Sequence, residues 1–127
     1  IENNDLIIEK NISFYSMCEH HFLPFFGKIS IGYIPNNKIV GFGDIIKVIE
    51  AYSKRPQLQE RLCDEIAETI YTGLDCQGVY VLMEAEHMCM TMRGVKSLGT
   101  KVITTSSKGI FNIQNSLKTE FLTLIKN

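Results

Sequence analysis

Alternating hydrophobic and polar positions mark the strands that this chain is predicted to form. Residues 28–34 alternate strictly, and a period of two is typical of a half-buried strand. Residues 6–15, rich in Leu, Ile and Phe, predict a strand before it, and a turn follows at residues 35–38. Two further strands are predicted over residues 79–89 and 101–106, and Val, Ile and Thr are frequent in the second of these.

A hydrophobic period close to four residues predicts two helices in the middle of the chain. Asp44 suits the first turn or the cap of the first helix. Pro56 is expected to open the second helix, where its missing N–H does no harm, and Gly73 or Gly78 to close it. Ser116 is expected to cap a short C-terminal helix. The hydrophobic faces comprise Ile45, Ile46, Val48, Ile49 and Tyr52 in the first helix, and Leu58, Leu62, Ile66 and Ile70 in the second.

The predicted element order is therefore ββααββ with a short C-terminal helix. This order is typical of an α+β fold, with an antiparallel sheet and the helices on one face. The 127 residues suffice for one domain with its own core, and no repeat or linker divides residues 1–127. We therefore predict a single domain.

The composition disfavours two classes of partner. Hydrophobic residues make up 45% of the chain, charged residues 21%, and the formal net charge is -1. This balance creates no basic field for nucleic acid or an anionic membrane, and no apolar run approaches the length of a membrane span. No basic stretch followed by an apolar one is seen, so we expect no signal segment. Unpaired thiols beside histidines suggest a reducing compartment, so we expect a cytoplasmic protein.

Two short segments, residues 16–21 and 86–89, hold all three histidines and two of the four cysteines. Cys18 and His21 have a chelating spacing, and Cys89 offers a third ligand. Thiolate and imidazole ligands together favour a zinc-type ion. Three protein ligands with no obvious fourth leave an open position, which is typical of catalytic zinc.

Other interpretations of the cysteines have to be weighed. An isolated Cys-x-x-His pair often arises by chance, and buried cysteines are mostly small hydrophobic residues, which we expect of Cys63 and Cys76. An even number of cysteines also permits disulfides. Because Cys18 and Cys89 each have histidines close by, metal binding suits them better.

The remaining histidines are candidates for proton transfer. Period two along the strand at residues 79–89 places His87 on the same face as Cys89. An isolated histidine is more often structural, but one beside a metal ligand is a good acid or base because its pKa lies near neutral pH. His20 has three open interpretations: a fourth metal ligand, a second proton donor, or a surface residue.

Three polar residues could contact a substrate. Gln59 and Glu60 lie in the first turn of the second helix, where a solvated polar face is the ordinary interpretation. Glu60 faces Asp64 one turn later, and this like-charge pair gives no local stabilisation. Arg93 is either an anion-binding residue at the rim of a cavity or an ordinary surface arginine.

Four ordered motifs lie at residues 18–25, 32–35, 55–62 and 87–94. They resemble those of the GTP cyclohydrolase I family, and the resemblance runs over nearly the whole chain. The resemblance implies the tunnelling fold (T-fold), in which subunits join their sheets into a barrel. It also implies a homodecamer with active sites between subunits. The helical region that typically begins the family is absent, and the chain starts at Ile1, so we expect a trimmed chain.

The resemblance implies that GTP and water give 7,8-dihydroneopterin triphosphate and formate, the entry to folate or biopterin synthesis. Zinc would be held by Cys18, His21 and Cys89, and it would lower the pKa of a bound water that attacks C8 of guanine. His87 would protonate N7, and His20 would assist the later opening of the ribose.

The resemblance also implies how the substrate is bound. Glu60, with Gln59, would bind the guanine edge, where a carboxylate can accept two N–H bonds in parallel. Arg93 would contact the triphosphate, and Lys47 stands where the family usually has a phosphate-binding arginine.

One departure concerns this phosphate-binding region. The family usually has Ser-Lys where this chain has Gly43 and Asp44, so a hydroxyl is lost and a cation becomes an anion. Lys47 cannot bind a phosphate bidentately as arginine does. Two alternatives therefore stay open: a non-catalytic paralogue that binds or assembles, and a zinc hydrolase of the same fold acting on a less phosphorylated purine. The intact cysteines, histidines and Glu60 argue against a loss of catalysis.

Overall fold

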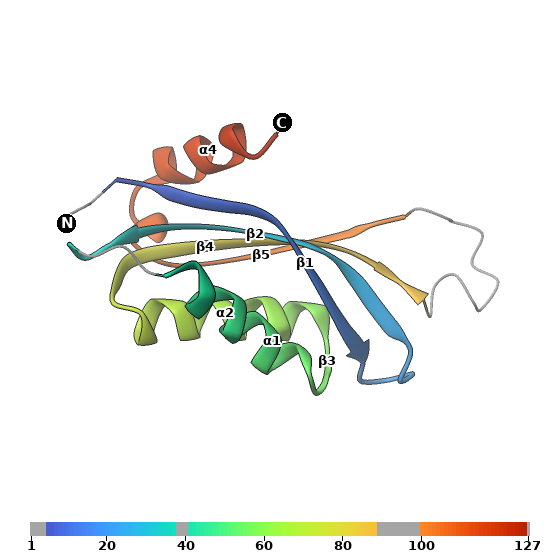
Figure 1. Ribbon diagram of the computed structural model, residues 1–127. Coiled ribbons are helices and arrows are strands. Elements are labelled where there is room, and N and C mark those ends of the chain that lie inside the picture. Colours follow the sequence, from blue (N-terminus) through green and yellow to red (C-terminus); the bar gives the residue numbers. More distant parts are fainter. Residues whose placement is uncertain (1–4, 38–40, 89–99, 127) are drawn as a thin grey trace.

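One twisted sheet of five strands organises the computed structural model, which describes residues 5–37, 41–88 and 100–126. The strand order is β3-β1-β2-β4-β5. Helices α1 and α2 cover one face of the sheet, and α4 lies across the other (Figure 1). The strands are β1 (Ile7–Cys18), β2 (Pro24–Pro35), β3 (Pro56–Gln57), β4 (Cys76–His87) and β5 (Val102–Gly109). The helices are α1 (Phe42–Ser53), α2 (Gln59–Gly73), the short 3-10 helix η1 (Ile110–Asn112) and α4 (Asn115–Leu124).

The predicted α+β order is confirmed, with one added strand. The four long strands pair antiparallel, and the two-residue β3 pairs in parallel with the end of β1. The prediction that Pro56 opens the second helix is wrong, because Pro56 begins β3 and α2 starts only at Gln59. Pairing with β1 keeps Gln57 extended, and the first position of a strand tolerates a proline. Gly73 closes α2 as expected, whereas Gly78 lies in β4.

Strand β2 is more deeply buried than its alternating sequence predicts. Residues 29–35 are all buried, because α1 and α2 cover one face of the strand and α4 with η1 covers the other. The ring of Phe121 on α4 lies so close to Gly32 that a Cβ there would meet it at 2.4 Å. The half-buried prediction was therefore wrong for this stretch, since the sequence period of β2 carries no information about α4.

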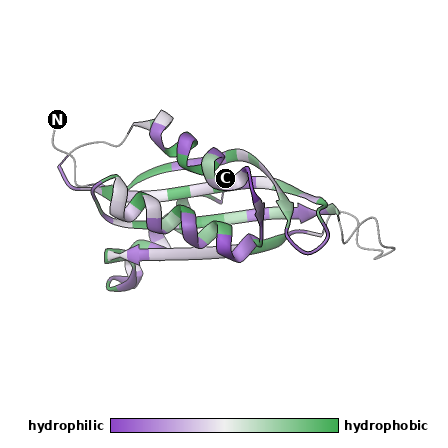
Figure 2. Ribbon diagram, turned by 90° about the horizontal axis from the view of Figure 1, so that it is seen from below, coloured by the Kyte–Doolittle hydropathy of each residue, from purple (hydrophilic) through white to green (hydrophobic). Residues whose placement is uncertain are grey.

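The main core lies between the sheet and the helices α1 and α2. Three residues of the predicted α2 stripe, Leu62, Ile66 and Ile70, are fully buried. The expectation that Cys63 and Cys76 are buried thiols is confirmed, and burial raises the pKa of each to about 11. Figure 2, seen from the side of these helices, shows hydrophobic stretches along the strands and mixed polarity along the helices.

The strand directions bring distant parts of the chain to one end of the sheet. Strand β1 ends at Cys18 and β4 ends at His87, and both flank the beginning of β2 at Phe25. Helix α2 starts beside this end, at Gln59. Among the residues that the structure describes, no helix combines the length and the apolarity needed to cross a membrane.

Candidate active site

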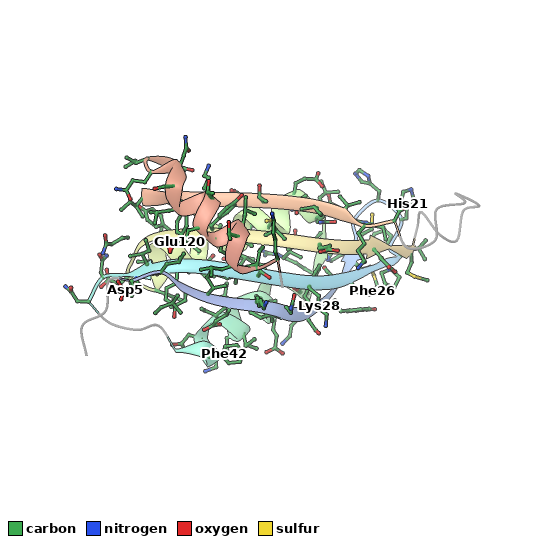
Figure 3. The ribbon with its side chains drawn as sticks, turned by 90° about the horizontal axis from the view of Figure 1, so that it is seen from above. Asp5, His21, Phe26, Lys28, Phe42 and Glu120 are labelled. Atoms are coloured by element: carbon green, nitrogen blue, oxygen red, sulfur yellow. The ribbon has the colours of Figure 1, made fainter. Side chains whose placement is uncertain are left out.

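Cys18 and His21 are brought together by a tight turn after β1. The backbone N–H of Phe22 donates to the Cys18 carbonyl at 2.8 Å, and the Cys18 N–H donates to the Leu23 carbonyl at 2.8 Å. Phe22 adopts a left-handed conformation with φ 54, which reverses the chain. As a result, the Cys18 Sγ and the His21 Nδ1 lie 3.8 Å apart. Figure 3 shows His21 at the end of the sheet remote from Asp5.

This separation fits two ligands of one zinc ion. Zinc bonds to sulfur and nitrogen at tetrahedral angles would place the two ligand atoms about 3.5 Å apart. Cys18 is buried and His21 is exposed, so the pair opens toward solvent on the side of His21. The described residues contain no group of three metal ligands, and Cys89, the predicted third, lies outside them. The residues present therefore fit a metal site of which two members are described.

His20 is the least defined of the predicted catalytic residues. Its side chain is exposed, and its ring meets that of His21 edge-on with centroids 6.3 Å apart. It thus lies next to the candidate ligand pair of Cys18 and His21. Its three interpretations stay open, and its role in ribose opening stays a prediction.

His87 is held in a defined orientation at the end of β4. Its Nε2 lies 2.6 Å from the Gln59 Oε1, and its ring stacks on Phe25 with centroids 4.8 Å apart and planes 3° from parallel. Burial lowers the pKa of His87 below 6.5, while the nearby Glu60 carboxylate acts in the opposite direction. A neutral His87 therefore donates its Nε2–H to Gln59 and keeps Nδ1 as the free acceptor.

Gln59 is a buried partner of His87 and not part of a solvated face. It is 2% exposed, and its Nε2 lies within hydrogen-bond distance of the Val102 carbonyl (2.9 Å), the Thr104 Oγ1 (3.2 Å) and the Met83 carbonyl (3.4 Å). These acceptors fix the amide with its nitrogen toward β4 and β5 and its oxygen toward His87. The hydrogen bonds of the side chain are thus directed within the protein. The predicted contact of Gln59 with guanine stays a prediction.

Replacing Gln59 by leucine is expected to lower kcat by about 10–100-fold, less than the full contribution of a general acid. The leucine fills similar space but frees the Nε2 of His87, so the imidazole loses its fixed tautomer. Nitrogen-15 NMR of the metal-free protein should show the Nε2–H form of His87 in the wild type and a mixture in the variant. The same spectra should titrate wild-type His87 with a midpoint below 6.5, because burial disfavours the imidazolium. An unchanged tautomer and an unchanged kcat would remove the orienting role of Gln59.

Glu60 stands next to this pair but faces solvent. It lies in the first turn of α2, it is exposed, and its carboxylate has no hydrogen bond or ion pair with other described residues. Its charge reaches His87, whose pKa it raises. The carboxylate is therefore available to a ligand at the same end of the sheet as Cys18 and His87.

The described residues of the predicted phosphate-binding region do not lie at this end of the single chain. Gly43, Asp44 and Lys47 are exposed near the start of α1, and Phe42 beside them lies far from His21 in Figure 3. The Asp44 carboxylate lies close to the backbone of Gly41, since a Cβ added to Gly41 would be 3.3 Å from the Asp44 Oδ2. The start of α1 nevertheless has no capping hydrogen bond from a side chain. Arg93 lies outside the described residues.

The sequence matches a profile of GTP cyclohydrolase I over residues 1–126. The chain belongs to the GTP cyclohydrolase I family. The GTP cyclohydrolase 1 of Fusobacterium nucleatum is 62% identical over 126 residues, which cover 99% of this chain and 67% of that protein. The GTP cyclohydrolase 1 of Clostridium perfringens is 54% identical over 125 residues, covering 98% and 68%. That of Dehalococcoides mccartyi is 50% identical over 127 residues.

Solved structures with low sequence identity confirm the fold expected of a GTP cyclohydrolase I family member. The archaeosine synthase QueF-Like in its apo form has a TM-score of 0.65 at 20% identity, covering 82% of this chain and 93% of that chain. A dihydroneopterin aldolase from Burkholderia thailendensis bound to guanine has a TM-score of 0.58 at 14% identity, covering 82% and 89%. Both are T-fold proteins, so the predicted T-fold is confirmed.

Proposed function

We propose that this chain catalyses the zinc-dependent hydrolysis and ring rearrangement of GTP to 7,8-dihydroneopterin triphosphate and formate. One observation carries the proposal: the oriented His87 and the Cys18–His21 pair share one end of the sheet in a member of the GTP cyclohydrolase I family. The product would enter folate or biopterin synthesis, and we expect this to occur in the cytoplasm.

Cys18 and His21, with Cys89, would hold the zinc ion. When bound, zinc supplies a Lewis acid and a water molecule that ionises near neutral pH. His21 offers its Nδ1 to the ion, on the side of the ring that faces the Cys18 sulfur.

His87 would act as the acid toward N7 of guanine. Its Nε2–H is engaged with Gln59, so the transferable proton is the one at Nδ1 of the imidazolium. Because burial lowers the pKa of His87, the imidazolium is a stronger acid than an ordinary histidine. Protonation of N7 withdraws electrons from C8 and favours attack there. Stacking on Phe25 holds the ring in place during the transfer.

Glu60 would bind the guanine edge and support the acid. Its exposed carboxylate can accept two parallel N–H bonds from the base, which carries such a pair on one edge. The same negative charge favours the imidazolium of His87 before proton transfer. Substrate binding and the acid are therefore coupled through one side chain.

The open edges of the sheet support assembly into a ring of subunits. Within the described residues, most of β1 and all of β5 have an unpaired outer edge, and such edges are usually covered by another strand. A groove of about 600 Å³ lies along β1 between Ser13–Met17 and α1, with exposed Tyr15 at its border. We propose that β5 of a neighbouring subunit pairs there and that a homodecamer results. The neighbour would also supply phosphate-binding residues such as Lys47.

The test of the proposed reaction is product formation by the full-length protein. Zinc-loaded protein is incubated with GTP, formate is measured, and the pterin is detected by fluorescence after oxidation. Equal amounts of formate and pterin are expected, with loss of both on chelation and recovery on adding zinc. Zinc-loaded protein that gives neither product from GTP, GMP or guanosine would favour the alternative of a binding or assembly paralogue.

A variant at Asp44 distinguishes GTP from a less phosphorylated purine as the substrate. Asp44→Ala is expected to lower KM for GTP about fivefold, corresponding to about 1 kcal/mol for one exposed charge near the triphosphate. KM for guanosine should not change, because guanosine carries no phosphate. Turnover of guanosine as efficient as that of GTP, with no effect of Asp44→Ala on either, would favour the alternative zinc hydrolase.

A further inference from the structure

Arg61 on α2 forms an ion pair with the turn that carries Cys18 and His21. The Glu19 carboxylate, inside this turn, accepts two bonds from the Arg61 guanidinium, Nη2 to Oε1 at 3.0 Å and Nη1 to Oε2 at 3.4 Å. The Arg61 Nε donates to the Gln57 Oε1 at 2.9 Å. All three guanidinium nitrogens are therefore engaged, in a fork that only arginine can form.

Gln57 provides a rigid support for this arginine. It is 1% exposed, and its Nε2 donates to the Tyr52 carbonyl at 2.9 Å and to the Glu65 Oε1 at 2.8 Å. Its own backbone carbonyl accepts the N–H of Glu19 at 2.9 Å. Because the amide nitrogen of Gln57 is bonded to Tyr52 and Glu65, its amide oxygen faces Arg61. The guanidinium is therefore bonded by Gln57 at Nε and by Glu19 at Nη1 and Nη2.

The first turn of α2 also bonds His87, through Gln59. Gln59 and Arg61 are two residues apart, and they reach β4 and the β1–β2 turn respectively. The beginning of one helix thus bonds both halves of the candidate active site. A rigid helix turn is suited to fix the distance between them, since partners behind metal ligands orient those ligands.

We propose that Arg61, through Glu19 and Gln57, is a positioning residue that sets the Cys18–His21 pair relative to His87. The proposal rests on the proposed function, because it takes Cys18 and His21 as zinc ligands. Arg61 itself touches neither substrate nor metal in this role. Its effect is to reduce the number of conformations that the turn samples before the metal binds.

A purely structural ion pair would behave differently. The side chains of Arg61 and Glu19 are 40% and 42% exposed, and exposed ion pairs contribute little to global stability. A positioning role therefore predicts a large effect on metal affinity with a small effect on unfolding. A structural role predicts small effects on both, or a loss of affinity that only follows a loss of stability.

The experiment compares Arg61→Lys, Glu19→Gln and the double variant with the wild type in the full-length protein. Arg61→Lys keeps the charge but cannot bond Glu19 and Gln57 together. Each single variant is expected to weaken zinc binding about 10–100-fold in competition with a chelator. In the metal-free protein, the amides of Cys18 and Phe22 should exchange with solvent faster, and Tm should change by less than about 4 °C.

The double variant and a control make the outcome specific. The double variant should lose no more affinity than either single variant, because both remove one shared interaction. The control is Lys108→Ala, which removes ion pairs from β5 to Asp64 and Glu68 on the same helix, away from the turn. It should leave zinc affinity and exchange of the turn amides unchanged.

The results separate this proposal from the proposed function. If the wild type binds zinc and Arg61→Lys binds it equally tightly, the positioning role is refuted while the proposed reaction stands. Additive losses in the double variant, or a loss of zinc affinity that Lys108→Ala shares, would refute the positioning role as well. A wild type that binds no zinc at all would refute the proposed function, and the positioning role with it.

Discussion

His87→Ala is expected to leave zinc bound and to lower kcat for GTP by about 10²–10⁴-fold, the usual contribution of a general acid. The imidazole is fixed by Gln59 and Phe25 at the end of β4, and its removal takes away the proposed proton donor without changing Cys18 or His21. Zinc per subunit and kcat are measured on the same preparation, so that both values refer to one sample.

The control for His87→Ala is the wild type stripped of zinc. It should lose turnover because the metal is gone, whereas the variant should lose turnover with the metal present. Normal turnover of His87→Ala would mean that another group protonates N7. Loss of zinc from His87→Ala would instead mean that this histidine is a metal ligand.

Cys18→Ser is expected to lose zinc, with a drop in affinity of more than about 100-fold. Replacing partners behind a metal ligand costs about 10–100-fold, so a direct ligand should cost more. Turnover should fall with the metal content. The measurement is zinc per subunit by elemental analysis after dialysis against a weak chelator.

Cys76→Ala is the matched control for Cys18→Ser. Cys76 is also a buried free thiol, but it begins β4, while His87 ends that strand. Its replacement should destabilise the protein slightly and leave zinc in place. A Cys18→Ser protein that keeps one zinc per subunit would rule out Cys18 as a ligand, whatever its activity.

Much of the fold follows from local patterns in the sequence. The period of α2 identifies Leu62, Ile66 and Ile70 as buried, and the alternation in β2 identifies a strand. What the patterns miss depends on distant partners. Phe121 covers the second face of β2 from a helix near the end of the chain, and β1 draws Pro56 into a strand pair. No local window contains these contacts.

The sequence predicts several residues of the candidate site but not the hydrogen bonds that hold them. Strand period and motif spacing point to His87 and to the Cys18–His21 pair, and the structure places these at one end of the sheet. A usable signal existed for Gln59, which precedes Cys63 by four and Ile66 by seven residues and so shares the buried face of α2. Because Gln59 is polar, the hydrophobic pattern assigned it to the solvated face instead.

The bond from Arg61 to Glu19 had no signal in the spacing of the sequence. The two residues lie on different elements, and their contact depends on the short strand β3, which the patterns do not predict. The residues predicted to bind phosphate present the same difficulty on a larger scale. If Lys47 reaches the substrate from a neighbouring subunit, a single chain carries only part of the information about the site.

We propose that Cys18, His21 and His87 form one zinc-dependent site for guanine. The most direct test of this proposal is a crystal structure of full-length His87→Asn with zinc and GTP, using anomalous scattering to locate the metal. We expect a zinc peak about 2.3 Å from the sulfurs of Cys18 and Cys89 and about 2.0–2.1 Å from the His21 Nδ1. We also expect guanine on Glu60 with N7 directed at residue 87. A metal bound elsewhere would refute Cys18 and His21 as zinc ligands, and guanine with N7 turned away from residue 87 would refute His87 as its acid.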